Sequence, residues 1–119
     1  MYKIINEEPK PVTNLKQDIP VIIEEILKKA LLAVVNEPRG TGSMARIKGI
    51  AVAGKTGTAQ NPHGEDHSCF IAYAPADEPA IAIAVIAENA GGGGAIAAPM
   101  AREVMRAYFG MKDPEPAVP

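Results

Sequence analysis

Three apolar runs in the middle of the chain constrain its fold more than any other feature, because the segments that join them are short. The runs cover residues 47–58, 67–74 and 80–88, and turn-forming Pro, Gly, Asn or Asp residues lie in each linker. Parallel strands need a crossover of a dozen or more residues, usually a helix. We therefore expect consecutive runs to pair antiparallel. The third run alternates isoleucine or valine with alanine, which predicts a central strand that is buried on both faces.

Two amphipathic helices flank these runs. Residues 18–37 carry apolar side chains at helical spacing, with Asp18 able to cap the helix and Pro20 in its first turn. Residues 96–109 form the second helix, which starts with Pro99 in its first turn. The expected fold class is therefore α+β, with three antiparallel strands and helices packed on the sheet.

The two ends of the chain are expected to lie outside this unit of sheet and helices. Residues 1–17 contain a short strand-like stretch and a polar connector, and residues 111–119 form a Pro-rich tail. Four glycines, residues 91–94, join the third run to the last helix, and a flexible link explains them without a ligand. With 119 residues the chain has about the size of one small domain.

The composition argues against several kinds of partner. The net charge is -2 at pH 7 and no block of like charge is present, so no nucleic-acid partner is expected. The only cysteine, Cys69, cannot form a disulfide within the chain. Residues 63–67 group metal-capable side chains, but Pro62 and Gly64 predict a turn, whereas a zinc pair of this spacing lies on a helix. We expect neither a metal nor another cofactor.

The stretch GIAVAGKTGT, residues 49–58, matches the phosphate-loop pattern G-x-x-x-x-G-K-[ST]. A phosphate loop requires a helix that begins at the Lys-Thr pair, here Lys55 and Thr56. The residues after the pair include Gly57 and a proline and start a helix poorly, so a strand that carries Lys55 is the favoured interpretation. A nucleotide-binding module that uses Gly49–Thr56 stays open as an alternative.

Lys-Thr-Gly at the end of a sheet-edge strand is also the third motif of the serine enzymes that bind penicillin. Around it, residues 34–60 (VVNEPRGTGSMARIKGIAVAGKTGTAQ) and 67–102 (HSCFIAYAPADEPAIAIAVIAENAGGGGAIAAPMAR) resemble the C-terminal end of a class B penicillin-binding protein transpeptidase domain. The resemblance is strongest to the cell-elongation type, similar to penicillin-binding protein 2. Cys69 departs from the family, which usually has Trp there. The resemblance implies that residues 1–119 form the C-terminal portion of a β-lactamase/transpeptidase-like fold.

The resemblance also implies a set of site residues. In such enzymes a serine attacks the peptide bond after a D-alanine, and the acyl group then passes to an amine of a neighbouring cell-wall peptide. Lys55, Thr56 and Thr58 would bind the terminal carboxylate of a peptidoglycan stem peptide ending in D-Ala-D-Ala, or of a β-lactam antibiotic. Gly57 would leave room for the substrate along the strand. The backbone N–H of Thr58 would be one donor of the oxyanion hole.

The family's serine motifs, S-x-x-K and S-x-N, are missing from the chain. Its two serines are Ser43, in Ser-Met-Ala-Arg, and Ser68, in Ser-Cys-Phe-Ile. Arg46 cannot act as the base in place of lysine, because a guanidinium stays protonated. The chain is therefore expected to carry one wall of the site without the nucleophile, and to be inactive alone.

The resemblance places the rest of such an enzyme in a longer parent protein. That parent would be a serine-type D,D-transpeptidase at the outer face of the bacterial cytoplasmic membrane, in the periplasm, anchored by a segment absent here. The chain would pack against the remainder of the transpeptidase domain, and alone its unpaired edge and exposed apolar face would favour self-association. A noncatalytic domain that keeps the fold for interaction alone is the second alternative.

Overall fold

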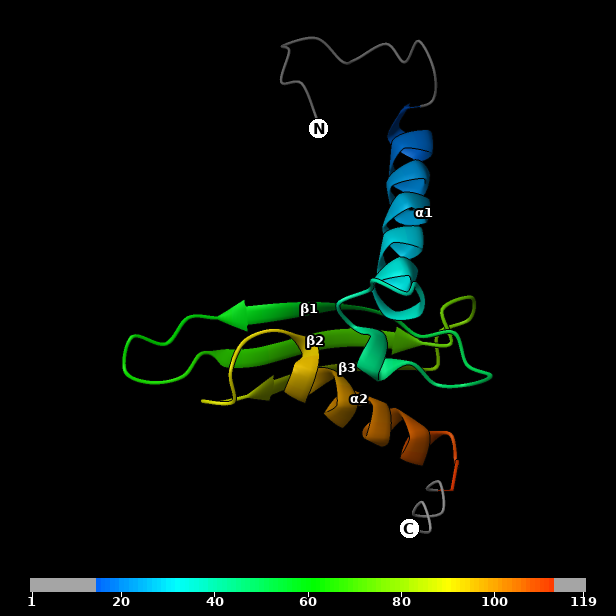
Figure 1. Ribbon diagram of the computed structural model, residues 1–119. Helices are drawn as coiled ribbons and strands as arrows, with labels where there is room; N and C mark the ends of the chain where they lie inside the picture. The colour runs from blue at the N-terminus through cyan, green and yellow to red at the C-terminus, as the bar shows by residue number, and fades with distance from the viewer. Residues whose placement is uncertain (1–14, 113–119) are drawn as a thin grey trace, which may run out of the picture.

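In the computed structural model, which describes residues 15–112, two helices and a short 3-10 helix accompany a three-stranded sheet (Figure 1). The elements are α1 (Leu15–Asn36), η1 (Ser43–Ala45), β1 (Ala53–Ala59), β2 (His67–Ala74), β3 (Ile81–Ala87) and α2 (Gly94–Tyr108). The strand-like stretch predicted near the start and most of the predicted tail lie outside the described residues. Residues 15–17, predicted as connector, belong to α1.

The sheet has the order β1-β2-β3, and both neighbouring pairs are antiparallel. The predicted antiparallel pairing is therefore confirmed. The described sheet does not show the central position predicted for residues 80–88: within residues 15–112, β2 takes the centre and β3 lies on an edge. The alternation in β3 separates its two faces. Ile81, Ile83 and Val85 are half-buried against the core, and the alanines between them are exposed.

β1 is shorter than the predicted run of residues 47–58. Gly49 has a φ of 86°, in the left-handed region that favours glycine, and it turns the chain so that Ile47 and Ile50 form an isolated bridge. The strand then begins at Ala53. The first apolar residues of the run therefore belong to a tight turn and not to the sheet.

Both helices begin earlier than predicted. α1 begins before Asp18, which therefore lies in the first turn and is not the cap. α2 begins at Gly94, and Pro99 lies inside the helix beyond its first turn. Ser68 of β2 explains this early start, because its hydroxyl accepts the N–H of Ala97 at 3.1 Å. The first N–H groups of a helix have no partner within the helix, so a neighbouring strand supplies one.

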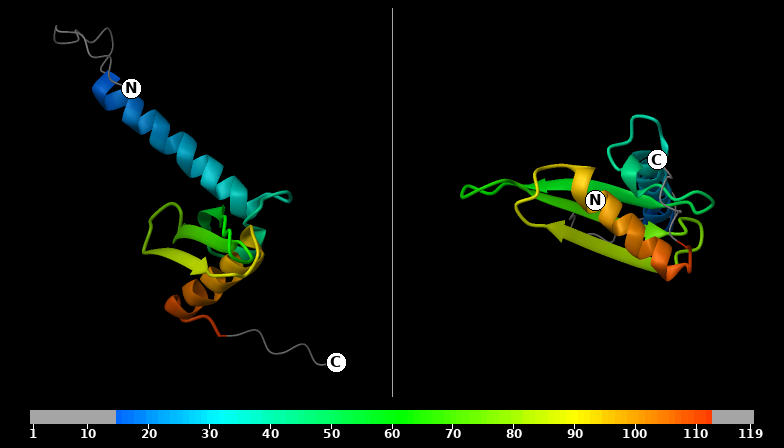
Figure 2. Two further views of the ribbon diagram at one scale, coloured as in Figure 1. Left: turned by 90° about the vertical axis from the view of Figure 1, so that its left-hand side faces the viewer. Right: turned by 60° about the horizontal axis from the view of Figure 1, so that its bottom comes forward.

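α2 packs along one face of the sheet (Figure 2). Along β2, every second residue from Ser68 to Ala74 is buried on this face. Phe70 is 1% exposed and occupies the middle of the core. The fully buried side chains of α2 are Ala97, Ala98, Ala101 and Met105. Alanine side chains allow the helix to lie close to the strands, as expected for a helix packed on a sheet.

α1 differs from α2, because only its C-terminal end reaches the sheet (Figures 1 and 2). Val35 is fully buried and Leu31 is half-buried. The N-terminal half of the helix is apolar and exposed at Val21, Ile22, Ile23, Ile26 and Leu27. The apolar stripe predicted for residues 18–37 is present, but within residues 15–112 only its C-terminal end is covered.

Two polar side chains join the end of α1 to the segment before β1. The guanidinium of Arg46 donates to the backbone oxygens of Val35, Asn36 and Glu37 at 3.1–3.3 Å. The side-chain amide of Asn36 donates to the backbone oxygen of Val52 at 2.9 Å. Since the last carbonyl groups of a helix have no partner within the helix, Arg46 acts here as a cap of α1.

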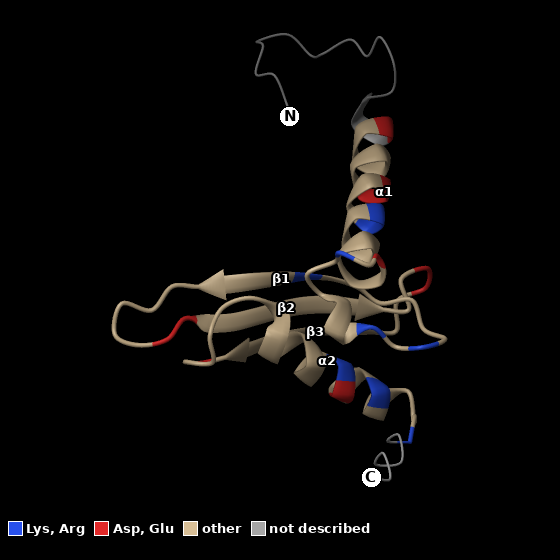
Figure 3. Ribbon diagram, viewed as in Figure 1, with Lys and Arg blue, Asp and Glu red and all other residues tan. Residues whose placement is uncertain are grey.

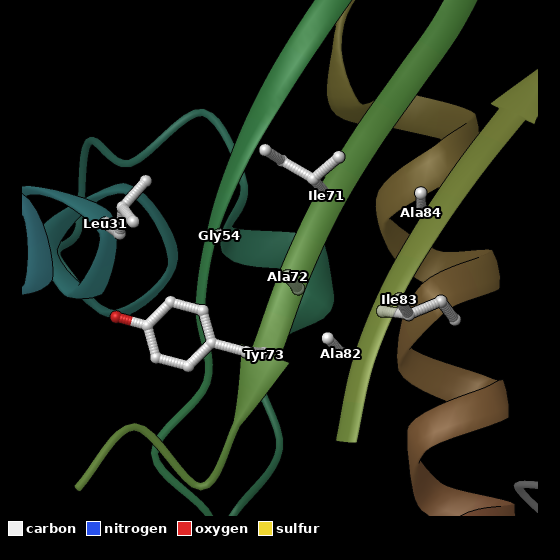
Figure 4. A pocket seen from close by; sticks show the side chains of 8 residues that line it. All are labelled: Leu31, Gly54, Ile71, Ala72, Tyr73, Ala82, Ile83 and Ala84. Atoms are coloured by element: carbon white, nitrogen blue, oxygen red, sulfur yellow. The ribbon is translucent and has the colours of Figure 1, made fainter. Parts of the chain in front are cut away.

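The other face of the sheet carries a shallow apolar hollow of about 390 Å³ (Figure 4). Leu31 of α1 and Tyr73 of β2 border it, together with Ile71, which is 58% exposed. The other lining residues are Gly54, Ala72, Ala82, Ile83 and Ala84. Within the part of the chain that the structure describes, this face is covered only where the end of α1 crosses it.

Candidate functional site

The four predicted site residues, Lys55 to Thr58, lie together on β1. Within residues 15–112, β1 pairs only with β2, so its other edge bonds no strand. Lys55 was predicted at the end of its strand, but it is the third residue of β1, because the pairing continues to Ala59 opposite His67. It carries the only charge on β1 (Figure 3). The site therefore lies on an edge strand, in its middle and at its C-terminal end.

The side chains of these residues alternate between the two faces of the sheet. Lys55 and Gly57 lie on the face of the apolar hollow, where Lys55 is paired with Ile71. Thr56 and Thr58 lie on the face of α2. The edge of the strand runs between these two rows. A ligand that lies along this edge can therefore reach groups from both faces.

Lys55 is exposed, and its side chain turns back along its own strand. Its ammonium donates to the backbone oxygen of Thr56 at 2.8 Å. An ammonium carries three N–H donors, so two remain for a ligand. This contact holds the positive charge beside the strand edge.

The two threonine hydroxyls bond to groups from different loops. Thr56 Oγ1 lies 3.0 Å from Thr41 Oγ1, a hydrogen bond in which either hydroxyl can donate. Thr58 Oγ1 accepts the backbone N–H of Gly93 at 2.7 Å. Neither Thr41 nor Gly93 was predicted to take part. The glycine segment 91–94 does link β3 to α2, as predicted, but it also contacts the site, and only the run of glycines itself could have drawn attention to it.

Gly57 has no side chain, and the fold does not require that. An added Cβ would lie 3.4 Å from the Cβ of Cys69, which is an ordinary van der Waals contact. The face beside Gly57 is therefore open at the strand edge.

The two serines of the chain lie in β2 and at the start of η1. Ser68 is fully buried and donates to the backbone oxygen of Gly93 at 2.5 Å, in addition to accepting the N–H of Ala97. Ser43 begins η1, three residues before Arg46, which caps α1. Ser68 is thus committed to joining β2 with the start of α2.

The histidine-containing segment 63–67 forms the turn and first residue of the β1–β2 hairpin. His67 accepts the backbone N–H of Asn89 at its Nδ1 atom, at 3.0 Å. Asn61 donates to the side-chain oxygen of Asn89 at 2.6 Å, which joins this hairpin to the segment after β3. Across residues 15–112, no three His, Cys, Asp or Glu side chains gather in a way that could hold a metal ion.

The phosphate-loop alternative requires a helix at Lys55 and Thr56. Both residues instead lie within β1 and pair with Ile71 and Phe70. The geometry therefore favours the strand motif over a nucleotide site. In the described part of the chain, none of the helices combines the length and the apolar character needed to cross a membrane.

Comparison with known proteins places the chain among transpeptidases. Residues 2–106 match the family described as penicillin binding protein transpeptidase domain. The chain is 42% identical over 107 residues to the peptidoglycan D,D-transpeptidase MrdA of Haemophilus influenzae, which covers 76% of the chain and 16% of that protein. It is 40% identical over 99 residues to stage V sporulation protein D of Bacillus subtilis, covering 72% and 15% respectively. The chain thus spans about a sixth of the length of these relatives.

Solved structures show the same likeness in three dimensions. The structure of Pseudomonas aeruginosa PBP2 in complex with WCK 5153 matches with a TM-score of 0.62 at 36% identity, over 77% of this chain and 21% of that one. An imipenem acyl-enzyme complex of penicillin-binding protein A from M. tuberculosis matches with a TM-score of 0.57 at 34% identity, over 76% and 19%. The arrangement of helices on an antiparallel sheet is therefore shared with these proteins.

Proposed function

The chain belongs to the penicillin-binding protein transpeptidase family, and on that premise we propose that it is the C-terminal part of a peptidoglycan D,D-transpeptidase of the cell-elongation type. It supplies the Lys-Thr-Gly wall of the active site. One observation carries this proposal: Lys55, Thr56, Gly57 and Thr58 follow one another on a strand edge that, in residues 15–112, is open to a ligand. The serine nucleophile comes from another part of the longer protein, which is called the full-length protein below.

The substrate carboxylate is the group that Lys55 recognises. The terminal carboxylate of a stem peptide ending in D-Ala-D-Ala only accepts hydrogen bonds. The ammonium of Lys55 and the hydroxyls of Thr56 and Thr58 supply charge and donors for it. All hydrogen bonds to an ionised carboxylate are charge-assisted, and Lys55 contributes most because it alone among these donors carries a positive charge.

The backbone of Thr58 has a second role in the reaction. The serine oxygen attacks the carbonyl carbon of the D-Ala-D-Ala peptide bond, and the carbonyl oxygen becomes an oxyanion. When this oxyanion re-forms the C=O bond, the bond to the last D-alanine breaks, and the D-alanine amine leaves with the proton that the serine gave up. The N–H of Thr58, together with the N–H of the serine, donates to that oxyanion. The acyl group then passes to an amine of a neighbouring peptide. The fold itself would accept a Cβ at Gly57. The missing side chain therefore serves the substrate, which gains room beside the strand.

β-Lactams are the second class of ligand. A relative of this chain forms an acyl-enzyme with imipenem, and the full-length protein is proposed to react in the same way. By the same analogy it lies at the outer face of the bacterial cytoplasmic membrane, in the periplasm, held by an anchor segment elsewhere in its sequence.

The remainder of the transpeptidase domain is the partner that covers the apolar surfaces of this chain. The exposed N-terminal half of α1 and the exposed Ile71 and Ile86 on the open face of the sheet support this. Large exposed apolar patches mark interaction sites in soluble proteins. Expressed alone, residues 1–119 are expected to self-associate through these surfaces, and a dispersed monomer in light scattering at high concentration would contradict that.

A fluorescent penicillin tests the proposed function in the full-length protein. Lys55→Ala is expected to slow acylation by roughly 10- to 100-fold, because one charge-assisted hydrogen bond is lost. Lys48→Ala is the matched control, since Lys48 is an exposed lysine in the turn before β1, and it should react like the wild type. A folded wild type that forms no adduct would favour the noncatalytic alternative, and binding of a fluorescent ATP that Lys55→Ala abolishes would favour the nucleotide alternative.

A further inference from the structure

The glycine loop, residues 91–94, contacts the C-terminal half of β1 although the two segments are far apart in sequence. It leaves the end of β3 and crosses toward the start of α2 (Figure 1). The backbone N–H of Gly93 donates to Thr58 Oγ1 at 2.7 Å, across 35 residues of sequence. The loop is thus in direct contact with a residue of the proposed site.

This hydrogen bond determines what the Thr58 hydroxyl can do next. A hydroxyl has one O–H donor and two acceptor lone pairs, whereas a backbone N–H only donates. Thr58 Oγ1 is therefore the acceptor toward Gly93, and within residues 15–112 no other group takes its O–H, which can donate to a ligand. A carboxylate only accepts. The contact with Gly93 therefore leaves Thr58 an O–H donor, which is the group that a substrate carboxylate can bind.

The glycine loop also limits where the Thr58 side chain can lie. An added Cβ on Gly92 would come within 2.8 Å of Thr58 Cγ2 and 3.1 Å of Thr58 Oγ1. Gly93 has a φ of 79°, a conformation that favours glycine and that directs its N–H at Thr58. Side chains at these two positions would displace Thr58 or turn the amide away from it.

The same loop is also held in place by β2 and by the turn that precedes it. The carbonyl oxygen of Gly93 accepts the hydroxyl of the fully buried Ser68. The N–H of Gly91 donates to the backbone oxygen of Asp66 at 3.0 Å. An element that positions a binding group must itself be held by neighbouring groups, and these bonds meet that condition.

We propose that Gly92 and Gly93 are positioning residues that orient the Thr58 hydroxyl toward the substrate carboxylate. Gly93 does so by donating its N–H to Thr58 Oγ1, and Gly92 by leaving space for Thr58 Cγ2. This inference rests on the proposed function, because it assigns that same carboxylate as the ligand of Thr58.

The test measures acylation of the full-length protein by a fluorescent penicillin. Gly92→Ala is expected to slow acylation by about 10- to 100-fold, because a displacement of about 1 Å can cost up to 100-fold. A rescue variant combines Gly92→Ala with Thr58→Ser, because serine lacks the Cγ2 atom that the new methyl group would meet at 2.8 Å. Relative to Thr58→Ser alone, this combination should lose less than about threefold. Gly64→Ala is the matched control: its methyl meets only the side-chain ends of Asn61 and Asn89, and it should react like the wild type.

A second measurement does not depend on activity. NMR of threonine methyl groups reports the rotamer of Thr58, and Gly92→Ala should shift its methyl signal while Gly64→Ala should not. If the wild type forms no adduct, the proposed function fails, while the methyl signal still decides whether Gly92 positions Thr58. If the wild type reacts and Gly92→Ala reacts equally fast, or if removing Cγ2 does not restore the rate, the positioning role is wrong. An unshifted methyl signal in Gly92→Ala would also overturn it.

Discussion

The two glycines of β1 are three residues apart and differ in what the fold requires of them. At Gly54, an added Cβ would lie 2.6 Å from the backbone oxygen of Ile71 and 2.7 Å from the ring of Phe70. At Gly57, an added Cβ would have only an ordinary contact, 3.4 Å from the Cβ of Cys69. Packing therefore explains the glycine at position 54 and does not explain the one at position 57.

The same division holds for the strand as a whole. Ala53 and Gly54 are buried, with Tyr73 beside Ala53 on one face and the Phe70 ring beside Gly54 on the other. From Lys55 onward every residue of β1 is half-buried or exposed. The buried half joins the strand to the core, and the open half has the residue types of the proposed site. Substitutions in the first half should therefore change stability, and those in the second half should change reaction rates.

The largest difference is expected at Thr58, in the open half. In the full-length protein, Thr58→Ala removes a hydroxyl but keeps the backbone N–H, whereas Thr58→Pro removes that N–H. Losing one oxyanion donor costs on the order of 10² to 10³ in rate, so Thr58→Pro should react with a fluorescent penicillin that much more slowly than Thr58→Ala. Circular dichroism must show that the strand tolerates a residue that cannot donate in a ladder. Equal rates for the two folded variants would remove the oxyanion role from this N–H.

The two glycines allow a direct comparison of stability. Gly54→Ala should lower the free energy of unfolding by about 1–3 kcal/mol, because the new methyl overpacks the core against a backbone oxygen. Gly57→Ala should change it by less than about 0.5 kcal/mol, as other surface substitutions do, and should still slow acylation by crowding the substrate. Urea denaturation of the full-length protein measures the first effect and fluorescent penicillin the second. Similar losses of stability in both variants would mean that β1 is not divided in this way.

The sequence alone was sufficient for features that depend on residues close together in the chain. Short linkers between the apolar runs predicted the antiparallel pairing, which the structure confirms. The Lys-Thr-Gly motif and the threonine after it are four consecutive residues, so Lys55 to Thr58 could be proposed as a site without knowledge of the fold.

Features that depend on distant residues were missed for a physical reason. The alternation in residues 80–88 indicates which side chains share a face. It does not indicate whether another element covers that face or which strands lie on either side, so the central position predicted for β3 is not seen in the described sheet. The bond from Gly93 to Thr58 depends on how a loop after β3 crosses the sheet. No local pattern records such a crossing. Arg46 was considered only as a substitute base, and its contact with the end of α1 required the structure.

The smallest effect is expected at Asn36, which ties α1 to the buried half of β1. Its side-chain amide donates to the backbone oxygen of Val52, next to the start of the strand, and to that of Leu32 within the helix. Asn36→Ala removes both bonds and should lower the free energy of unfolding by about 1–2 kcal/mol, since one hydrogen bond in a protein has a typical net value of about 1 kcal/mol. Acylation should stay at the wild-type rate, because the side chain of Asn36 bonds to the backbone oxygens of Leu32 and Val52 and to none of the proposed site residues. Lys29→Ala, at an exposed position of the same helix, is the control and should change stability by less than about 0.5 kcal/mol.

Urea denaturation and fluorescent penicillin measure the two effects on the same preparations. A loss of rate without a loss of stability in Asn36→Ala would show that the buried half of β1 also controls the reaction, and that the two halves cannot be treated separately.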